Sequence, residues 1–149
     1  MSTVQFTLNG QSVEAPAGQS IFNIAKELGI AIPHLCHKEG LEPDGNCRAC
    51  VVEVAGERTL APSCCRSATP GMQVTTDSVR AVKSQKMVLE MLLSDLPEQG
   101  HKWLDDRFDA PHGELSQWVE HHGVQVRPAL AALKREAVPA DLTHPAMAV

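Results

Sequence analysis

The first thirty residues alternate and then repeat in a way that predicts a β-hairpin followed by a helix. In TVQFTL, residues 3–8, apolar side chains occupy every second position, and a similar run, QSVEA, follows Asn9-Gly10. Asn-Gly between two alternating runs is a strong signal for a tight hairpin turn. Beyond the hairpin, apolar positions recur at helical spacing, at Ile21, Ile24, Ala25 and Leu28. Ser20 is the candidate N-cap of this helix, and Gly29 its stop.

The middle of the chain predicts three further short strands and then a long helix. Residues 50–54, CVVEV, are rich in β-branched side chains, and a turn at Ala55-Gly56 leads to a short return strand. A last strand is expected over residues 71–75. From residue 78 to about Pro97 the period becomes helical, with apolar side chains at Val79, Val82, Val88, Met91 and Leu92. The order of elements indicates an α+β fold, a small mixed sheet with a helix packed across it.

The part of the chain after Glu98 predicts two short helices and an extended end. The first covers residues 111–122, with Gly123 as its stop, and its inward side chains are expected to be Leu115, Trp118 and Val119. A second helix is expected over residues 128–136. The final stretch, AVPADLTHPAMAV, is rich in Pro and Ala and is typical of an extended linker.

Composition and charge exclude several classes of function. A net charge of −5 and an aromatic content of 3% argue against nucleic-acid binding, which needs a basic surface and often stacking rings. No apolar run approaches the roughly 20 residues that span a bilayer. The start, MSTVQFTLNG, has neither a basic nor an apolar signal region, so we expect a cytoplasmic protein. Cytosolic thiols stay reduced, so five cysteines indicate metal or redox chemistry rather than disulfides.

The spacing of the cysteines favours an iron–sulfur cluster over zinc. They lie at Cys36, Cys47, Cys50, Cys64 and Cys65, and the first four give C-x10-C-x2-C-x13-C. Structural zinc sites usually pair two C-x2-C knuckles, whereas here the second knuckle is missing because the last two cysteines are adjacent. Three segments converging on one site suit a 2Fe–2S cluster better, and a structural zinc module remains the alternative. His34 and His37 are expected to be polar loop residues, since four cysteines already suffice.

The loop between the cysteines is built to bring backbone close to a cofactor. Gly40, Gly45 and Ala49 have small or no side chains, and Asn46 can adopt a positive φ. Backbone N–H groups that point at thiolate sulfurs offset their negative charge. Arg48 lies between two candidate ligands, and its side chain is expected to point away from the metal. A thioredoxin-like dithiol is disfavoured, because C-R-A-C here leads into a strand rather than a helix.

Two stretches, PHLCHKEGLEPDGNCRACVVEV and LAPSCCRSATPGMQV, extend these observations to a known family. They resemble the N-terminal 2Fe–2S domain of the large iron–sulfur subunit of respiratory complex I, and the related domains of NAD-linked hydrogenases and of NAD-dependent molybdenum or tungsten formate dehydrogenases. The shared pattern is a cysteine, ten residues, C-R-x-C-x-V-E-V, and a later S-C before G-M-x-V. The resemblance is specific over residues 1–95. The tail motifs EQGHKW, PHGELSQW and THPAMAV resemble most closely the formate dehydrogenase alpha subunit.

The resemblance implies a β-grasp 2Fe–2S ferredoxin-like domain over residues 1–78, followed by a helical C-terminal extension over residues 79–149 that acts as linker or docking segment. It implies four cluster ligands, Cys36, Cys47, Cys50 and Cys64, with backbone support from Gly45, Asn46, Arg48 and Ala49. Cys64 is preferred to Cys65 because the family ligand lies seven residues before the Gly of the G-M step. The complex I relatives carry a 4Fe–4S motif after the helix. SDLPEQGHKWLDDRF has no cysteine, so no second cluster is expected.

The function implied is one-electron transfer through a single low-potential cluster. The chain is expected to serve in an NAD-dependent formate dehydrogenase, between a molybdopterin centre and a flavin or NADH-oxidising partner, with further 4Fe–4S domains among its partners. Two alternatives from the same class are a stand-alone ferredoxin and the iron–sulfur subunit of an NAD-linked hydrogenase. No nucleotide-binding loop or catalytic dyad is recognisable, so no catalytic centre of its own is expected.

Overall fold

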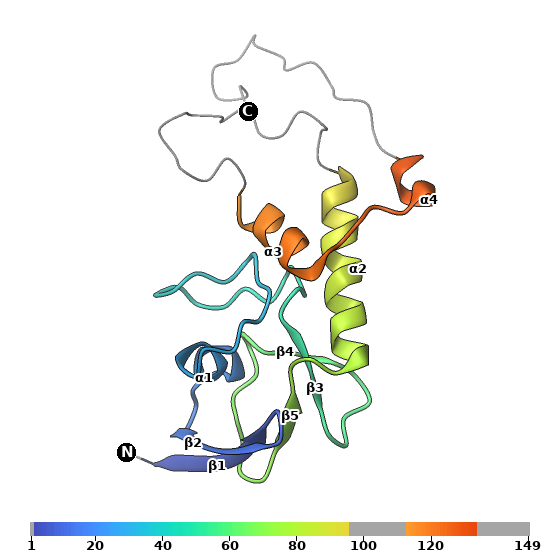
Figure 1. Ribbon diagram of the computed structural model, residues 1–149. Helices are drawn as coiled ribbons and strands as arrows, with labels where there is room; N and C mark the ends of the chain where they lie inside the picture. The colour runs from blue at the N-terminus through green and yellow to red at the C-terminus, as the bar shows by residue number, and fades with distance from the viewer. Residues whose placement is uncertain (1, 96–112, 134–149) are drawn as a thin grey trace.

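The structure, a computed structural model, describes residues 2–95 and 113–133, and its centre is a mixed sheet (Figure 1). The strands are β1 (Thr3–Leu8), β2 (Gln11–Pro16), β3 (Val51–Val54), β4 (Ala61–Pro62) and β5 (Gln73–Thr75). Their order is β2-β1-β5-β3-β4, with β1 and β5 parallel and the other pairs antiparallel. The described helices are α1 (Ile21–Glu27), α2 (Val79–Asp95), α3 (Glu114–His122) and α4 (Pro128–Ala131). The mixed sheet with helices confirms the predicted α+β class.

The N-terminal hairpin forms as predicted from the alternating pattern. β1 and β2 pair in register, with Phe6 opposite Val13. Asn9 and Gly10 both have positive φ, 49° and 80°, as the central residues of a type I′ turn require. Phe6 and Leu8 are 3% and 1% exposed, so the predicted apolar face of β1 is the face that enters the core.

Helix α1 begins and ends where its capping residues predicted. The Ser20 side chain accepts a hydrogen bond from the Asn23 N–H at 3.2 Å, and Gly29 follows the helix with φ 73°. Four of its side chains are buried in the core, those of Ile21, Phe22, Ile24 and Ala25. The short helix is therefore held mainly by burial of one side, as expected for a segment too short to be stable alone.

Helix α2 forms over the predicted residues but buries a different face from the one its apolar residues mark. Val79 is 89% exposed and Met91 59% exposed. The buried positions are Ala81, Gln85 and Leu89, spaced four residues apart, with Glu90 beside them. The hydrophobic pattern could not identify this face, because its centre is a glutamine.

Gln85 is buried because it supplies a donor that the sheet lacks. Its side-chain amide donates to the backbone carbonyls of Val51 and Thr76, at 2.9 and 3.3 Å. β5 pairs with β3 only at Glu53 and Val54, so the Val51 carbonyl lies beyond the paired stretch. A buried carbonyl without a donor is costly, and the amide removes that cost while it fastens α2 to β3.

Several predicted boundaries shift in the structure. β3 begins at Val51 rather than residue 50, and β5 covers Gln73–Thr75 rather than residues 71–75. α3 begins at Glu114, whereas residues 111 and 112 of that prediction lie outside the described residues. It ends as predicted at Gly123, which has left-handed φ and ψ of 58° and 41°. α4 is shorter than predicted, Pro128–Ala131, and residues 134–136 of that prediction lie outside the described residues, as does the predicted extended end.

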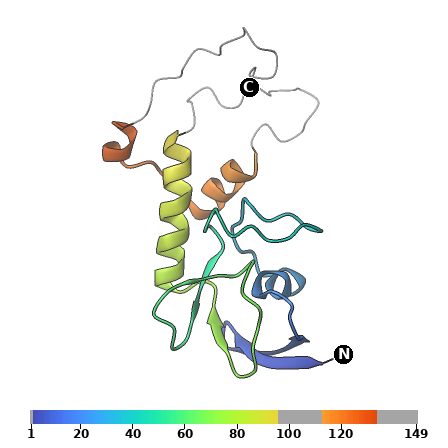
Figure 2. The same cartoon turned by 180° about the vertical axis from the view of Figure 1, so that it is seen from behind.

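The cysteine-bearing loop lies between helices from both halves of the described chain. In Figure 1 and in the reverse view of Figure 2, residues 33–49 leave the end of α1 and run beneath α3 before they enter β3. α2 stands beside β3 and also contacts α3. Across the described ranges, 2–95 and 113–133, no helix combines the length and the apolar character that crossing a bilayer requires.

Candidate metal centre

The structure brings Cys36 and Cys47 together at the two ends of the glycine-containing loop. The backbone N–H of Cys47 points at the Cys36 sulfur, with 3.4 Å between nitrogen and sulfur. The N–H of Ala49 points in turn at the Cys47 sulfur, at 3.5 Å. Both cysteines are half-buried. Amide donors of this kind stabilise the negative thiolate, as the loop composition predicted.

Cys50 and Cys64 form a second pair, deeper in the molecule. Their sulfur atoms are 3.3 Å apart, and each residue is 1% exposed. Ser63, also fully buried, makes two hydrogen bonds to the Cys50 carbonyl, from its N–H at 3.1 Å and from its hydroxyl at 2.7 Å. These bonds fix the start of β3 against the segment that carries Cys64.

Helix α1 fixes the same segment from the other side. The N–H of Ile21 donates to the carbonyl of Arg66 at 2.8 Å, and the N–H of Phe22 donates to that of Ser63 at 3.0 Å. The first N–H groups of a helix have no hydrogen-bond partner within the helix. These two contacts therefore satisfy the amides of α1, and they also hold residues 63–66 in place.

Burial raises the pKa of the Cys64 thiol, and hydrogen bonding with Cys50 raises it further. A thiol in this setting stays protonated at neutral pH. Metals bind the thiolate, so metal binding at Cys64 must displace a proton, and the charge of the metal replaces the solvation that burial removes.

Three residues of the loop have left-handed backbone, Gly40, Gly45 and Arg48, and the last two lie within two residues of Cys47. Gly45 has φ 70°, and a Cβ there would lie 2.9 Å from the Cys65 sulfur, so the backbone passes where a side chain would not fit. Arg48, between the candidate ligands Cys47 and Cys50, has φ 57°. Asn46, which was expected to be able to adopt a positive φ, does not adopt one here. Its side chain instead donates to Asp44, and the turn occurs two residues later.

Cys65 lies at the surface beside the buried pair. Its sulfur is 3.5 Å from that of Cys64 and 4.0 Å from the Pro43 carbonyl oxygen. Cys65 is exposed, whereas Cys64 is enclosed by the bonds of Ser63 and α1. The two adjacent thiols therefore differ in their exposure to solvent.

The residues present suit a binuclear cluster held by four thiolates. Among the residues that the structure describes, no three or more His, Cys, Asp or Glu side chains lie close enough together to hold one ion. The four candidate cysteines instead form two pairs, since the Cys47 amide contacts the Cys36 sulfur and the Cys50 sulfur contacts the Cys64 sulfur. Two irons bridged by inorganic sulfur take two thiolates each, whereas a single zinc ion needs all four around one point. The soft donors, the amides aimed at sulfur and the space left by Gly45 all fit a 2Fe–2S cluster.

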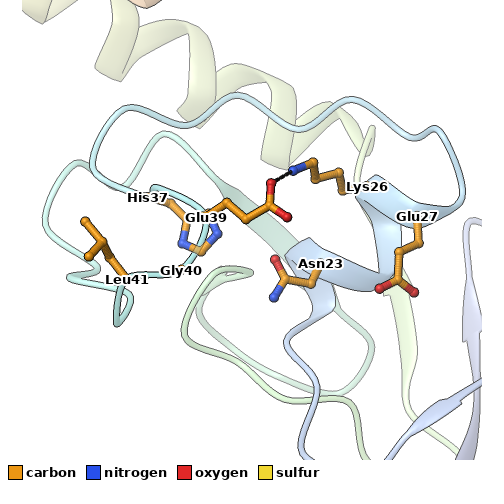
Figure 3. A pocket seen from close by; sticks show the side chains of 7 residues that line it. All are labelled: Asn23, Lys26, Glu27, His37, Glu39, Gly40 and Leu41. Carbon is orange, nitrogen blue, oxygen red and sulfur yellow. Dashed lines mark hydrogen bonds and ion pairs between the residues drawn. The ribbon is translucent and has the colours of Figure 1, made fainter.

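A small cavity separates the loop from α1 (Figure 3). It has a volume of about 320 Å³, and Lys26 and His37 are among the residues that line it. Lys26 of α1 forms an ion pair with Glu39 at 2.8 Å across it. Burial is the main cause that lowers the pKa of His37, and the neighbouring His34 and Lys26 lower it further.

Helix α3 contacts the loop from the opposite side. The Trp118 ring lies 5.6 Å from the His34 ring, centroid to centroid, and Glu114 forms an ion pair with Lys38 at 3.1 Å. His34 and His37 also meet the ring of Phe22, each at 4.7 Å. The flanks of Cys36 are therefore packed between α1 and α3. Trp118 is half-buried, as are the other two side chains that were expected to point inward from this helix.

Two residues that position the site were missed by reasoning from the sequence. In the sequence, Ser63 was noted only as the serine before Cys64 in the family pattern. Nothing in that pattern predicted its two hydrogen bonds to the Cys50 carbonyl. Gln85 is a polar residue within the apolar spacing of α2, and nothing in the sequence indicated that it would be buried. Both act through backbone carbonyls, which leave no trace in hydrophobic periodicity.

Comparison with known proteins identifies the class to which this site belongs. Residues 1–79 match the family model described as "2Fe-2S iron-sulfur cluster binding domain". The chain belongs to this family.

The relatives are subunits of larger redox enzymes. The chain is 44% identical over 103 residues to the NADP-reducing hydrogenase subunit HndD of Solidesulfovibrio fructosivorans, covering 66% of this chain and 18% of that protein. It is 39% identical over 97 residues to the mitochondrial NADH-ubiquinone oxidoreductase 78 kDa subunit of Candida albicans, covering 65% of this chain and 14% of that protein. This chain thus spans less than one fifth of the length of these curated relatives.

A solved structure extends the similarity to the fold. A chain of an NAD+-reducing NiFe-hydrogenase, crystallised in the H2-reduced state, matches with a TM-score of 0.69 and 28% identity. The match covers 97% of this chain and 58% of that chain. The fold and the family therefore agree on a 2Fe–2S domain related to those of NAD-linked hydrogenases and NADH-ubiquinone oxidoreductases.

Proposed function

We propose that this chain is a one-electron carrier that holds a single 2Fe–2S cluster. Its ligands are four cysteine thiolates, those of Cys36, Cys47, Cys50 and Cys64. The observation that carries the proposal is the arrangement of these cysteines as two pairs in a chain of the 2Fe–2S family: the half-buried Cys36 and Cys47, joined by an amide-to-sulfur contact, and the buried Cys50 and Cys64, joined sulfur to sulfur. When bound, the cluster takes up and releases one electron without making or breaking a bond to substrate.

The residues around the site keep its geometry fixed between the two oxidation states. The N–H groups of Cys47 and Ala49 stabilise negative charge on the sulfurs, and the bonds from Ser63 and α1 hold the buried pair. Four thiolates with no histidine ligand favour a low potential, on the order of −400 mV as in plant-type ferredoxins. Gly45, Asn46, Arg48 and Ala49 supply the backbone that wraps the site.

We assign residues 1–78 to a β-grasp 2Fe–2S domain and residues 79–149 to an extension that links or docks it to partner domains. Packing of α3 on the loop, through Trp118 and Glu114, supports a linking role, because it ties the extension to the loop that carries Cys36 and Cys47. One cluster is assigned to this chain, with no 4Fe–4S cluster and no catalytic centre of its own.

Within this class, the function we favour is the electron-transfer module of an NAD-dependent formate dehydrogenase. The tail motifs support this assignment, and the chain works between a formate-oxidising molybdopterin centre and a flavin or NADH-oxidising subunit in the cytoplasm. The second candidate is the iron–sulfur subunit of an NAD-linked hydrogenase, which the similarity to HndD and to the NiFe-hydrogenase structure favours. Reduction of the cluster by formate but not by hydrogen, with the partner subunits present, distinguishes the two.

The ligand assignment is tested by exchanging the adjacent cysteines. We expect Cys64→Ser to abolish the visible absorbance of the anaerobically reconstituted chain and Cys65→Ser to retain it, because only Cys64 faces the buried partner Cys50. Iron and sulfide per chain are measured alongside. The reverse result overturns the assignment, and a colourless chain loaded with zinc supports the structural zinc module instead.

A further inference from the structure

The sulfur of Cys65 begins a row of three that leads from the surface into the core. Cys65 is exposed, and its sulfur is 3.5 Å from that of Cys64, which is 3.3 Å from that of Cys50. Both inner cysteines are 1% exposed. The four ligands of the proposed function leave Cys65 without a role, although its sulfur contacts one of them.

We propose that Cys65 is the solvent-facing thiol of a disulfide relay that operates in the cluster-free chain. A glutathione-type disulfide cannot reach the buried thiols of Cys50 and Cys64 directly. It reacts with Cys65 instead, and two exchange steps then pass the oxidation inward until Cys50 and Cys64 are bridged. The relay goes beyond the proposed function, because it depends on the three sulfur contacts and not on the bound cluster.

The steps balance as thiol–disulfide exchanges. The Cys65 sulfur attacks glutathione disulfide, forms a mixed disulfide and releases the first glutathione. The Cys64 sulfur then attacks that of Cys65 and releases the second glutathione. The Cys50 sulfur finally attacks that of Cys64, and Cys65 returns to a thiol. In sum, two protein thiols are oxidised, one glutathione disulfide is reduced to two glutathiones, and these carry away the protons of Cys50 and Cys64.

Backbone geometry drives the disulfide inward from Cys65. Adjacent residues have Cα atoms about 3.8 Å apart across a trans peptide, shorter than the roughly 4.4–6.8 Å of ordinary disulfides. A bridge between Cys64 and Cys65 is therefore strained and easily attacked. Cys50 is separated from Cys64 by 14 positions and lies on another segment, so its bridge carries no such restraint.

The ligand loop keeps Cys65 directed toward Cys64. Gly45 approaches so closely that a Cβ there would lie 2.9 Å from the Cys65 sulfur. If the proposed ligand set holds, closure of the Cys50–Cys64 bridge removes two ligands, and the cluster cannot bind until that bridge is reduced. The row of sulfurs then acts as a redox gate on cluster loading.

The relay is tested with the full cluster-free chain, reduced and desalted without oxygen, and then incubated with glutathione disulfide. After alkylation and digestion with trypsin, Cys50 lies in residues 49–58 and Cys64 and Cys65 lie in residues 59–66. Tandem mass spectrometry then localises the bridge within the second peptide. We expect a Cys50–Cys64 bridge and a free Cys65, with two glutathiones released for each such bridge.

Matched variants separate the relay from direct oxidation. Cys65→Ser is expected to slow closure by about tenfold or more, because a buried sulfur must then react first. Val79→Ser, at an exposed residue of α2 outside the assigned ligand set, leaves the row intact and should close at the parent rate. Cys50→Ser should stop with glutathione on Cys65 or with a Cys64–Cys65 bridge. Circular dichroism checks that each variant is folded, and Cys65→Ala replaces Cys65→Ser if the latter is not.

Equal closure rates with and without Cys65 overturn the relay, as does stable glutathione on Cys65 in the parent chain. Failure of the relay is distinguishable from failure of the proposed function. A chain that closes the bridge yet never binds a cluster supports the relay alone, and one that binds a cluster without closing the bridge supports the proposed function alone.

Discussion

Replacement of Gly45 by alanine tests whether the ligand loop is wrapped as tightly as the structure indicates. Gly45 has φ 70°, where a residue with a Cβ is disfavoured by about 1–2 kcal/mol. Alanine also restricts the unfolded chain, which returns roughly 0.4–1 kcal/mol of stability. Conformation alone therefore predicts a net loss of about 1 kcal/mol in the free energy of unfolding.

Contact with Cys65 adds a second cost at this position. The new Cβ would lie 2.9 Å from the Cys65 sulfur, so that side chain must leave its rotamer, at a cost of about 0.5–1.5 kcal/mol. We therefore expect Gly45→Ala to lose about 2 kcal/mol in total. Gly40→Ala is the matched control, because Gly40 has φ 82° with no atom within 4 Å of the position that a Cβ would take, and it should lose only about 1 kcal/mol.

The assay is urea unfolding of the full chain in its cluster-free form, followed by circular dichroism. Both glycine variants are compared with the double variant Gly45→Ala/Cys65→Ala, in which the sulfur is absent. If the contact is the cause, the double variant recovers about 1 kcal/mol relative to the sum of its single changes. Equal losses at Gly40 and Gly45, together with no recovery in the double variant, would refute the reasoning.

Three further changes test how the helices hold the site. Gln85→Met should lower the free energy of unfolding by about 2–4 kcal/mol, because two buried carbonyls lose their donor, and an unchanged urea midpoint would contradict this. Trp118→Leu should speed hydrogen exchange around His34 roughly fivefold, since the lost ring contact is worth about 1 kcal/mol, while exchange in β1 stays unchanged. Hydrogen bonds from Arg127 hold the pKa of the Glu90 carboxyl below its usual range. The ionised pair therefore stabilises the fold at neutral pH, and this contribution is lost as the pH falls through the lowered pKa. Thermal unfolding of the parent and Glu90→Gln should therefore differ at neutral pH and converge in acid, and a difference that persists in acid argues against the pair.

The sequence predicted those elements whose signals are local. Asn9-Gly10 specifies the hairpin turn, Ser20 caps α1, and Gly123 ends α3, because each acts on the backbone beside it. The cysteine spacing and the small residues of the loop likewise predicted a 2Fe–2S cluster, which is the cofactor named in the description of the family.

The features that the sequence did not predict depend on contacts between distant segments. The buried face of α2 centres on Gln85, whose partners lie in β3 and after β5, so the spacing of the apolar residues could not identify that face. The hydroxyl hydrogen bond from Ser63 to Cys50 spans 13 positions and needs β3 and β4 to be in place. The positive φ at Arg48 rather than Asn46 likewise follows from how the loop closes on β3, since intrinsic preference favours asparagine.

The most direct test of the account is the electron paramagnetic resonance spectrum of the anaerobically reconstituted full chain after reduction with dithionite, with iron and acid-labile sulfide counted on the same sample. The account predicts one signal of a reduced 2Fe–2S centre, which integrates to one spin per chain with iron and sulfide in equal amount. A folded chain that gives no such signal and contains zinc, or no metal, would contradict it.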